Sequence, residues 1–422
     1  MKNFKKLAAA ALSVVLSAAT FGCSTPAIGG NTRNALTIDG YDVPAGLFIY
    51  YTLQGYSEAS SLVQSQNGDG STPTPDDVKN AQIKDTDSTE WIQDKATEYC
   101  RDFVNIQREF DAINGELTED QKNEAKQMAE YYYGSDSRLE DNGISLETME
   151  LMTLSSYKQQ EIFKHYYGFD SEFGCSEDEL KDYFEDNFAR VKYISISLLD
   201  SEGNKLSDDE QRTLRKKAEE YAKQINEKSD GLDKMLEVDT AQKDYDDYKA
   251  AQTTTSSNLE PTVETTTTAV STSGESTSAE TTTTTDPYAN EQLIQKNTTT
   301  TKDETAIEIG TTTTTAEDPT ETDDYKFKEF IFNKLEMNKA TVYDYNDDTI
   351  YVVIRADIRE RLNKDDLWSD DYIENLQKMR YTDAFVDFLQ KKAEKLDIVK
   401  NKSAYRRYEP FKKLKLEADS AK

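Results

Sequence analysis

Apolar residues recur at steps of three and four along the first part of the chain, which is the spacing of helices that bury one face. The clearest run stops before Asn114-Gly115, a helix end, and consists of Ile92, Ala96, Tyr99, Phe103, Ile106, Phe110 and Ile113. Thr118 and Ser176 are each followed three residues later by Gln or Glu, the capping-box pattern that starts a helix. Ser145 likewise predicts the start of a helix through Tyr167. We therefore expect residues 35–189 to be mainly helical.

The pattern changes at Arg190. Residues 191–199 alternate between apolar and polar side chains, which predicts a strand, and helical periodicity follows over 207–227 and 232–248. After a polar interval, the pattern predicts a helix over 325–335, strands over 341–345 and 350–356, and a long helix over 367–396. Together these elements predict an α+β fold.

A threonine-rich tract separates the two groups of elements. Threonine runs interleaved with Ser, Glu and Asp dominate it, a composition typical of O-glycosylated stalks. Such a tract has too little apolar surface to offset the entropy lost when a backbone is ordered. We therefore expect residues 251–323 to be disordered and without chemistry. Leu293 and Ile294 are interpreted as filler, with a short recognition motif as the alternative.

The composition of the chain excludes some classes of function. The chain of 422 residues has 81 Asp and Glu against 50 Lys and Arg, and its net charge is −31. Because phosphate backbones repel such a chain, we expect no nucleic-acid partner. The single histidine excludes His-rich metal sites and any mechanism that needs two histidines from one chain. We expect no metal and no cofactor.

The N-terminus predicts export from the cytoplasm. Residues 1–22 combine three lysines, an apolar run and a small residue before Cys23, which is typical of a secretory signal peptide. The Gly22-Cys23 ending resembles a bacterial lipobox, in which the cysteine thiol carries lipid, and residues 23–34 suit a tether. We expect an extracytoplasmic protein anchored to the cell membrane through lipid on Cys23, with a soluble secreted protein as the alternative. Cys100 and Cys175 could pair outside the cell, but the sequence favours free thiols.

The order of these segments resembles the extracytoplasmic foldases of the PrsA and SurA type. The similar stretches are the segment 36–43, the helix start 176–184 and the strand 191–199. The resemblance implies a mainly helical chaperone domain built from both chain ends, with an inserted small parvulin-like (PpiC-type) α/β domain. Accordingly, residues 35–189 form the N-terminal helical domain, and residues 190–250 and 324–358 form the two parts of the parvulin-like domain. Residues 359–422 supply the C-terminal helix that completes the helical domain, and a basic tail.

Two tyrosines stand where parvulins have histidines. Matching the family's first and last strands places Tyr193 and Tyr351 at those positions, and the family's central segment falls on the threonine-rich tract. Prolyl isomerisation requires a barrier of about 18–20 kcal/mol to be lowered by a shaped pocket and positioned hydrogen bonds. The resemblance therefore implies a parvulin-like module without catalysis, in which both tyrosines pack on a sheet. An active peptidyl-prolyl cis-trans isomerase is the alternative.

Aromatic clusters elsewhere in the chain point to binding. The sequence has 25 Tyr and 16 Phe, and tyrosine is a stiff, amphipathic contact for unfolded chain segments. The candidate client-binding residues are Phe48, Tyr50, Tyr51, Tyr131, Tyr132, Tyr166 and Tyr167. For each of them, core packing is the alternative.

The leading hypothesis is an extracytoplasmic, membrane-anchored folding chaperone that binds unfolded or newly exported polypeptides. A cell-surface structural or assembly lipoprotein is a further alternative. The basic tail over 400–415 is either a contact for anionic lipids or a solvated face.

Overall fold

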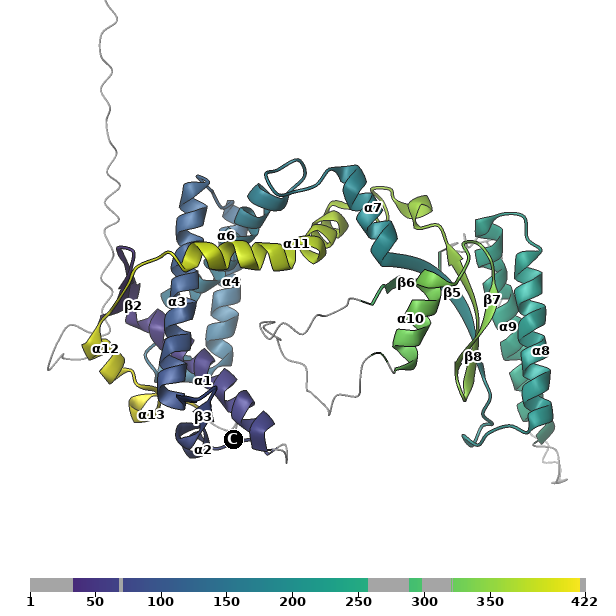
Figure 1. Cartoon of the computed structure of the whole chain (residues 1–422), viewed down its shortest axis with the longest axis horizontal. Helices are drawn as coiled ribbons and strands as arrows, with labels where there is room; N and C mark the ends of the chain where they lie inside the picture. The colour runs from purple at the N-terminus through teal and green to yellow at the C-terminus, as the bar shows by residue number, and fades with distance from the viewer. Residues whose placement is uncertain (1–32, 68–70, 257–287, 298–319, 321, 418–422) are drawn as a thin grey trace, which may run out of the picture. The chain divides into compact units, whose positions relative to one another are not determined.

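The computed structural model describes residues 33–67, 71–256, 288–297, 320 and 322–417 (Figure 1). The predicted signal peptide, Cys23 and most of the threonine-rich tract lie outside these residues. The protein is α+β, mainly helical with small sheets, as predicted. The chain divides into two compact units, one from residues 1–175 and 381–422 and the other from residues 176–380. In the described part of the chain, no helix is long and apolar enough to cross a membrane.

The first unit is mainly helical. Its elements before residue 176 are β1 (Asn34–Ile38), β2 (Tyr41–Pro44), α1 (Ala45–Asn67), α2 (Pro75–Asn80), β3 (Gln82–Ile83), β4 (Thr86–Asp87), α3 (Ser88–Ala112), α4 (Glu119–Ser135), α5 (Ser137–Asp141) and α6 (Leu146–Tyr167). Its later elements are the end of α11 (Asp370–Ala393), β9 (Ile398–Lys400), α12 (Lys402–Arg407) and α13 (Pro410–Lys413). The helices predicted from periodicity and capping are confirmed as α3, α4 and α6.

The two ends of the chain meet in the first unit. β1 turns into β2 through Asp39 and Gly40, whose positive φ angles of 46° and 85° form the predicted turn. The other edge of β1 pairs with β9, with Leu36 opposite Lys400. Beyond β9, Tyr408 and Phe411 pack against the apolar core around α1. The segment 400–415 is thus packed onto the first unit through its half-buried aromatic residues, while most of its charged side chains stay exposed.

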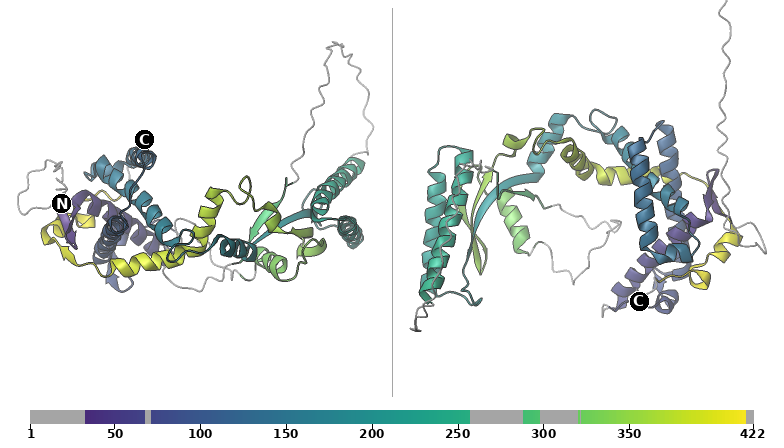
Figure 2. Two further views of the ribbon diagram at one scale, coloured as in Figure 1. Left: turned by 90° about the horizontal axis from the view of Figure 1, so that it is seen from above. Right: turned by 180° about the vertical axis from the view of Figure 1, so that it is seen from behind.

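The second unit is built around a four-stranded antiparallel sheet in the order β6-β5-β8-β7. Its elements are α7 (Glu177–Asn187), β5 (Phe188–Ser197), α8 (Asp208–Asn226), α9 (Gly231–Ser256), β6 (Gln292–Gln295), α10 (Asp323–Asn333), β7 (Thr341–Asn346), β8 (Thr349–Ala356), the 3-10 helix η2 (Ile358–Arg361) and the start of α11. The predicted strands are confirmed in β5, β7 and β8. Helices α8 and α9 cover one face of the sheet, and α10 lies on the other (Figures 1 and 2).

Alternation along β5 and β8 sorts their side chains between the two faces. The core shared with α8 and α9 contains Ile194, Ile196, Leu198, Ile350, Val352 and Ile354. The core shared with α10 contains Ala189, Val191 and Val353, and Tyr193 and Tyr351 lie at its margin. The two tyrosines therefore face the same side of the sheet.

The unit boundaries differ from those predicted. α7 belongs to the second unit, so the division falls after Cys175 and not after residue 189. The reason is that the ring of Phe184 lies 5.0 Å from Phe188 and 6.5 Å from Trp368, both in the second unit. The second division falls within α11, between residues 380 and 381, and not at residue 359.

The interval predicted to be disordered includes regular structure, since residues 251–256 lie in α9 and residues 292–295 form β6. Leu293 and Ile294 lie in β6, opposite Arg190 and Ala189 of β5, so their interpretation as filler is wrong. Ladder hydrogen bonds and the packing of Ile294 against the α10 core offset the entropy of ordering this short segment. The rest of the predicted disordered interval lies mostly outside the described residues.

Cys100 and Cys175 are free thiols, as the sequence favours. Both side chains are buried, and burial raises the pKa of Cys100 well above its ordinary value. A thiol in such an environment packs as a small apolar group and is a poor nucleophile.

Candidate functional site: an aromatic sheet face

The two tyrosines at the family's histidine positions lie against each other. Tyr193 on β5 and Tyr351 on β8 are diagonal neighbours across the pair of strands, because Tyr351 stands opposite Ser195. Their ring centroids are 4.5 Å apart, with planes at 28°. This offset stacking is a favourable geometry for two aromatic rings.

Two tyrosines of β7 extend this surface. Tyr343 stands directly opposite Tyr351, and a bulge between Asp344 and Asn346 brings the ring of Tyr345 to within 4.6 Å of Tyr351. We call Tyr193, Tyr343, Tyr345 and Tyr351 the tyrosine face. Phe327 and Phe330 of α10 flank it, since Phe327 lies 5.1 Å from Tyr351 and Phe330 stacks on Tyr343 at 4.4 Å.

The tyrosine face is only partly covered. α10 buries the end of the sheet face around Val191 and Val353 with Phe327, Ile331 and Leu335. Towards the other end the four tyrosines are half-buried, and Ser195, opposite Tyr351, is exposed. Ring surface and hydroxyl groups are therefore both accessible from solvent.

The pKa values of Tyr343, Tyr345 and Tyr351 are all raised above their ordinary value. Burial raises the pKa of Tyr351 to about 12, and its neighbours Tyr193 and Tyr345 add to the rise. Burial also raises the pKa of Tyr343 and Tyr345, with further contributions from the carboxylates that begin α10. Such hydroxyls offer hydrogen bonds but are far from the pKa that acid–base catalysis at neutral pH favours. The face is chemically suited to binding.

The candidate client-binding residues of the first unit fall into three groups, which are buried, half-buried and exposed. Phe48 and Tyr167 are core residues: Phe48 is fully buried and packs on Tyr405 at 4.7 Å, and Tyr167 stacks on Phe163 at 5.5 Å. Tyr50, Tyr51 and Tyr166 are half-buried and also pack on other rings. The structure therefore assigns Phe48 and Tyr167 to packing, because their helices press these side chains against the C-terminal segments.

Tyr131 and Tyr132 lie on the surface of α4. Tyr131 is 73% exposed and Tyr132 is 44% exposed, and their rings meet edge to face at 5.7 Å. Met128, one helical turn before Tyr132, is also exposed. This is the part of the predicted client-binding set that is accessible in the first unit.

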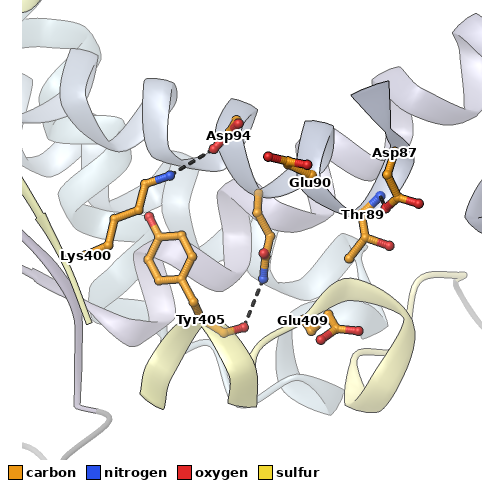
Figure 3. A pocket seen from close by; sticks show the side chains of 8 residues that line it. Asp87, Thr89, Glu90, Asp94, Lys400, Tyr405 and Glu409 are labelled. Carbon is orange, nitrogen blue, oxygen red and sulfur yellow. Dashed lines mark hydrogen bonds and ion pairs between the residues drawn. The ribbon is translucent and has the colours of Figure 1, made fainter. Parts of the chain in front are cut away.

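A polar pocket of about 540 Å³ marks the seam between α3 and the C-terminal segment (Figure 3). Gln93 donates a hydrogen bond to the carbonyl oxygen of Tyr405 at 2.9 Å, and Lys400 pairs with Asp94 at 2.9 Å. Asp87 caps α3, and Glu409 pairs with Lys412. Gln93, Asp94 and Lys400 thus hold α3 and the C-terminal segment together. Elsewhere too, within the described residues, no three His, Cys, Asp or Glu side chains are grouped as a metal site requires.

Sequence reasoning missed two charged side chains that are buried on the side of the sheet opposite the tyrosine face. Arg190 and Lys192 of β5 are almost fully buried, and Lys192 lies 2.5 Å from Asp239 of α9. Arg190 pairs with Glu291, just before β6. The alternation of the strand could have indicated their burial, since both cations fall in phase with Ile194, Ile196 and Leu198, on the core side of the strand.

Comparison of the chain with protein-family models, with curated proteins and with solved structures finds no match.

Proposed function

We propose that this protein is an extracytoplasmic folding chaperone that binds unfolded or newly exported polypeptides and is anchored to the cell membrane through lipid on Cys23. The observation that carries the proposal is the tyrosine face, where four half-buried tyrosines meet on one accessible sheet surface. Tyrosines of this kind bind varied sequences, because each ring offers apolar area and its hydroxyl offers a hydrogen bond. The exposed Tyr131 and Tyr132 supply a second contact in the first unit.

The charge of the chain fits this role. A net charge of −31 keeps a protein with accessible aromatic groups soluble, and it attracts basic unfolded segments over long range. The parvulin-like module acts here as a binding surface, because Tyr193 and Tyr351 stand where active parvulins have histidines.

Replacing both Tyr345 and Tyr351 by Ser should weaken client binding by about tenfold, because two ring contacts of about 0.5–1.5 kcal/mol each are lost along with their apolar area. Binding is measured by fluorescence anisotropy with reduced, alkylated lysozyme, a permanently unfolded and basic probe. Suppression of aggregation is measured by light scattering while lysozyme is reduced in the presence of a stoichiometric amount of the chaperone.

The matched control is Tyr248→Ser, which removes a half-buried tyrosine from α9 on the opposite side of the sheet. It should leave client binding unchanged. Equal binding by the double variant and the control would rule out the tyrosine face as the binding surface. Catalysed isomerisation of a prolyl peptide that Tyr193→Phe abolishes would instead support the enzyme hypothesis, and no suppression of aggregation at excess would support an assembly role.

A further inference from the structure

One edge of the central sheet is only half covered. β5 runs from Phe188 to Ser197, but its pairing with β6 ends at Val191. The N–H of Ser197 donates to the hydroxyl of Tyr245 on this edge, and the carbonyl of Asn187 accepts from Lys296, so odd-numbered residues turn their main-chain groups towards it. Tyr193 and exposed Ser195 thus present main-chain groups beyond the end of β6. An open row of this kind is a template for an added strand.

The covered half of the edge is occupied by a short segment, Tyr288–Gln295, that the sequence places inside the threonine-rich tract. Its anchor is the carboxylate of Glu291. The Nη2 of Arg190 donates to Oε1 of Glu291 at 3.0 Å, and the Nη1 of Arg361 donates to Oε2 at 3.0 Å. The Nε of Arg190 lies 2.8 Å from the same Oε2 as a purely electrostatic contact, since its angle does not meet hydrogen-bond geometry.

The two arginines form a carboxylate clamp that the rest of the unit holds in place. Arg190 also donates to the carbonyl of Asp357 at 2.7 Å, and Arg361 makes two hydrogen bonds to Asp366 at 2.6 and 2.7 Å. Arg190 is 1% exposed and Arg361 is 18% exposed. The clamp is therefore built by β5 and η2, and the segment 288–295 supplies only the carboxylate and the ring of Tyr288, which lies over both guanidinium groups.

The arginine clamp and the tyrosine face lie on opposite sides of the sheet, and the segment 288–295 contacts both, through Glu291 and Gln292 respectively. The side-chain amide of Gln292 donates to the hydroxyl of Tyr193 at 3.1 Å. A strand on this edge can thus place one side chain in the clamp and the next side chain against the proposed client-binding surface.

We propose that the edge of β5 is a strand-addition site for extended polypeptide segments that carry a carboxylate, and that Tyr288–Gln295 occupies this site as an internal ligand. This inference rests on the proposed function and specifies how an unfolded client is held. Main-chain hydrogen bonds give affinity for any extended segment, and the arginine clamp selects a carboxylate beside the strand. Because the internal ligand is part of the same chain, its effective concentration at the site is high. An external segment must therefore displace the internal ligand in order to bind.

The test uses the full chain and a fluorescent peptide with the sequence of residues 288–297, which contains Glu291. In the Glu291→Gln variant the internal segment loses its charge-assisted hydrogen bonds, and the peptide should bind at least about tenfold more tightly than to the unchanged protein. The same peptide with Gln in place of its Glu should bind the variant at least about tenfold more weakly. The control Glu336→Gln removes an equal charge from an exposed ion pair with Lys339 and should not change binding.

A second variant guards against loss of the fold. Ile294→Ser weakens the packing of β6 but leaves the clamp intact, and it should also raise peptide affinity. Hydrogen exchange of β5 and β8 amides verifies that the sheet persists in both variants. If the sheet persists but peptide affinity does not rise, or if the Glu and Gln peptides bind equally, the strand-addition site is wrong. If the protein still binds unfolded lysozyme in that case, the proposed chaperone function is not contradicted. If it binds no lysozyme at all, the chaperone function itself is contradicted.

Discussion

Replacing Arg190 by Met lowers the free energy of unfolding of the second unit by about 3 kcal/mol, because it leaves the buried carboxylate of Glu291 with fewer partners. Breaking a buried ion pair generally costs about 3–5 kcal/mol. We expect a loss at the lower end of this range because Arg361 still contacts Glu291. The buried carbonyl of Asp357 also loses its donor.

The two tryptophans of the chain make this measurement specific. Trp91 lies in the first unit and Trp368 in the second, so urea unfolding of a Trp91→Phe background reports the second unit through Trp368. The variant with both Arg190→Met and Glu291→Met should be less destabilised than Arg190→Met alone, since it leaves no carboxylate of Glu291 buried with too few partners. If the two substitutions are simply additive, the buried pair does not contribute as described.

Replacing Phe48 by Ala lowers the free energy of unfolding of the first unit by about 3–5 kcal/mol, the usual cost of a cavity left by a buried ring. Phe48 is fully buried, and it packs on Tyr405 of the C-terminal segment. Unfolding in a Trp368→Phe background, read through Trp91, measures the loss.

Tyr131→Ala is the matched comparison. Its side chain is 73% exposed, so the free energy of unfolding should change by less than about 0.5 kcal/mol. The proposed function predicts instead that this substitution weakens binding of unfolded lysozyme. A loss below about 1 kcal/mol for Phe48→Ala would contradict its assignment to the core.

Local sequence signals accounted for most helices. The capping boxes at Thr118, Ser176 and Ser207 all form in the structure, because both of their hydrogen bonds join residues only three positions apart. The strand over 191–199 was likewise evident, since alternation records which side chains meet a core. These elements depend on neighbours along the chain and need no knowledge of the rest of the fold.

The candidate site was predicted in its residues but not in its extent. Matching two strands singled out Tyr193 and Tyr351, yet their stacking depends on the β5–β8 register. Tyr343 and Tyr345 joined them through a bulge in β7 that nothing in the local pattern indicated. In the sequence, Phe48 and Tyr131 both stand in aromatic clusters and cannot be distinguished. Only the tertiary structure shows that Phe48 is a core residue and that Tyr131 is accessible.

The sequence by itself determined the α+β class, the positions of the main helices and strands, and the exclusion of mechanisms that need two histidines. It could not determine that Glu291, inside a tract of threonines, meets Arg190 and Arg361 from distant parts of the chain. Nor could it determine that Tyr405, Tyr408 and Phe411 pack against the cores around α1 and α3. Helix periods and caps are decided by side chains a few residues apart, whereas ion pairs, sheet edges and burial are decided by which distant segments the folded chain brings together.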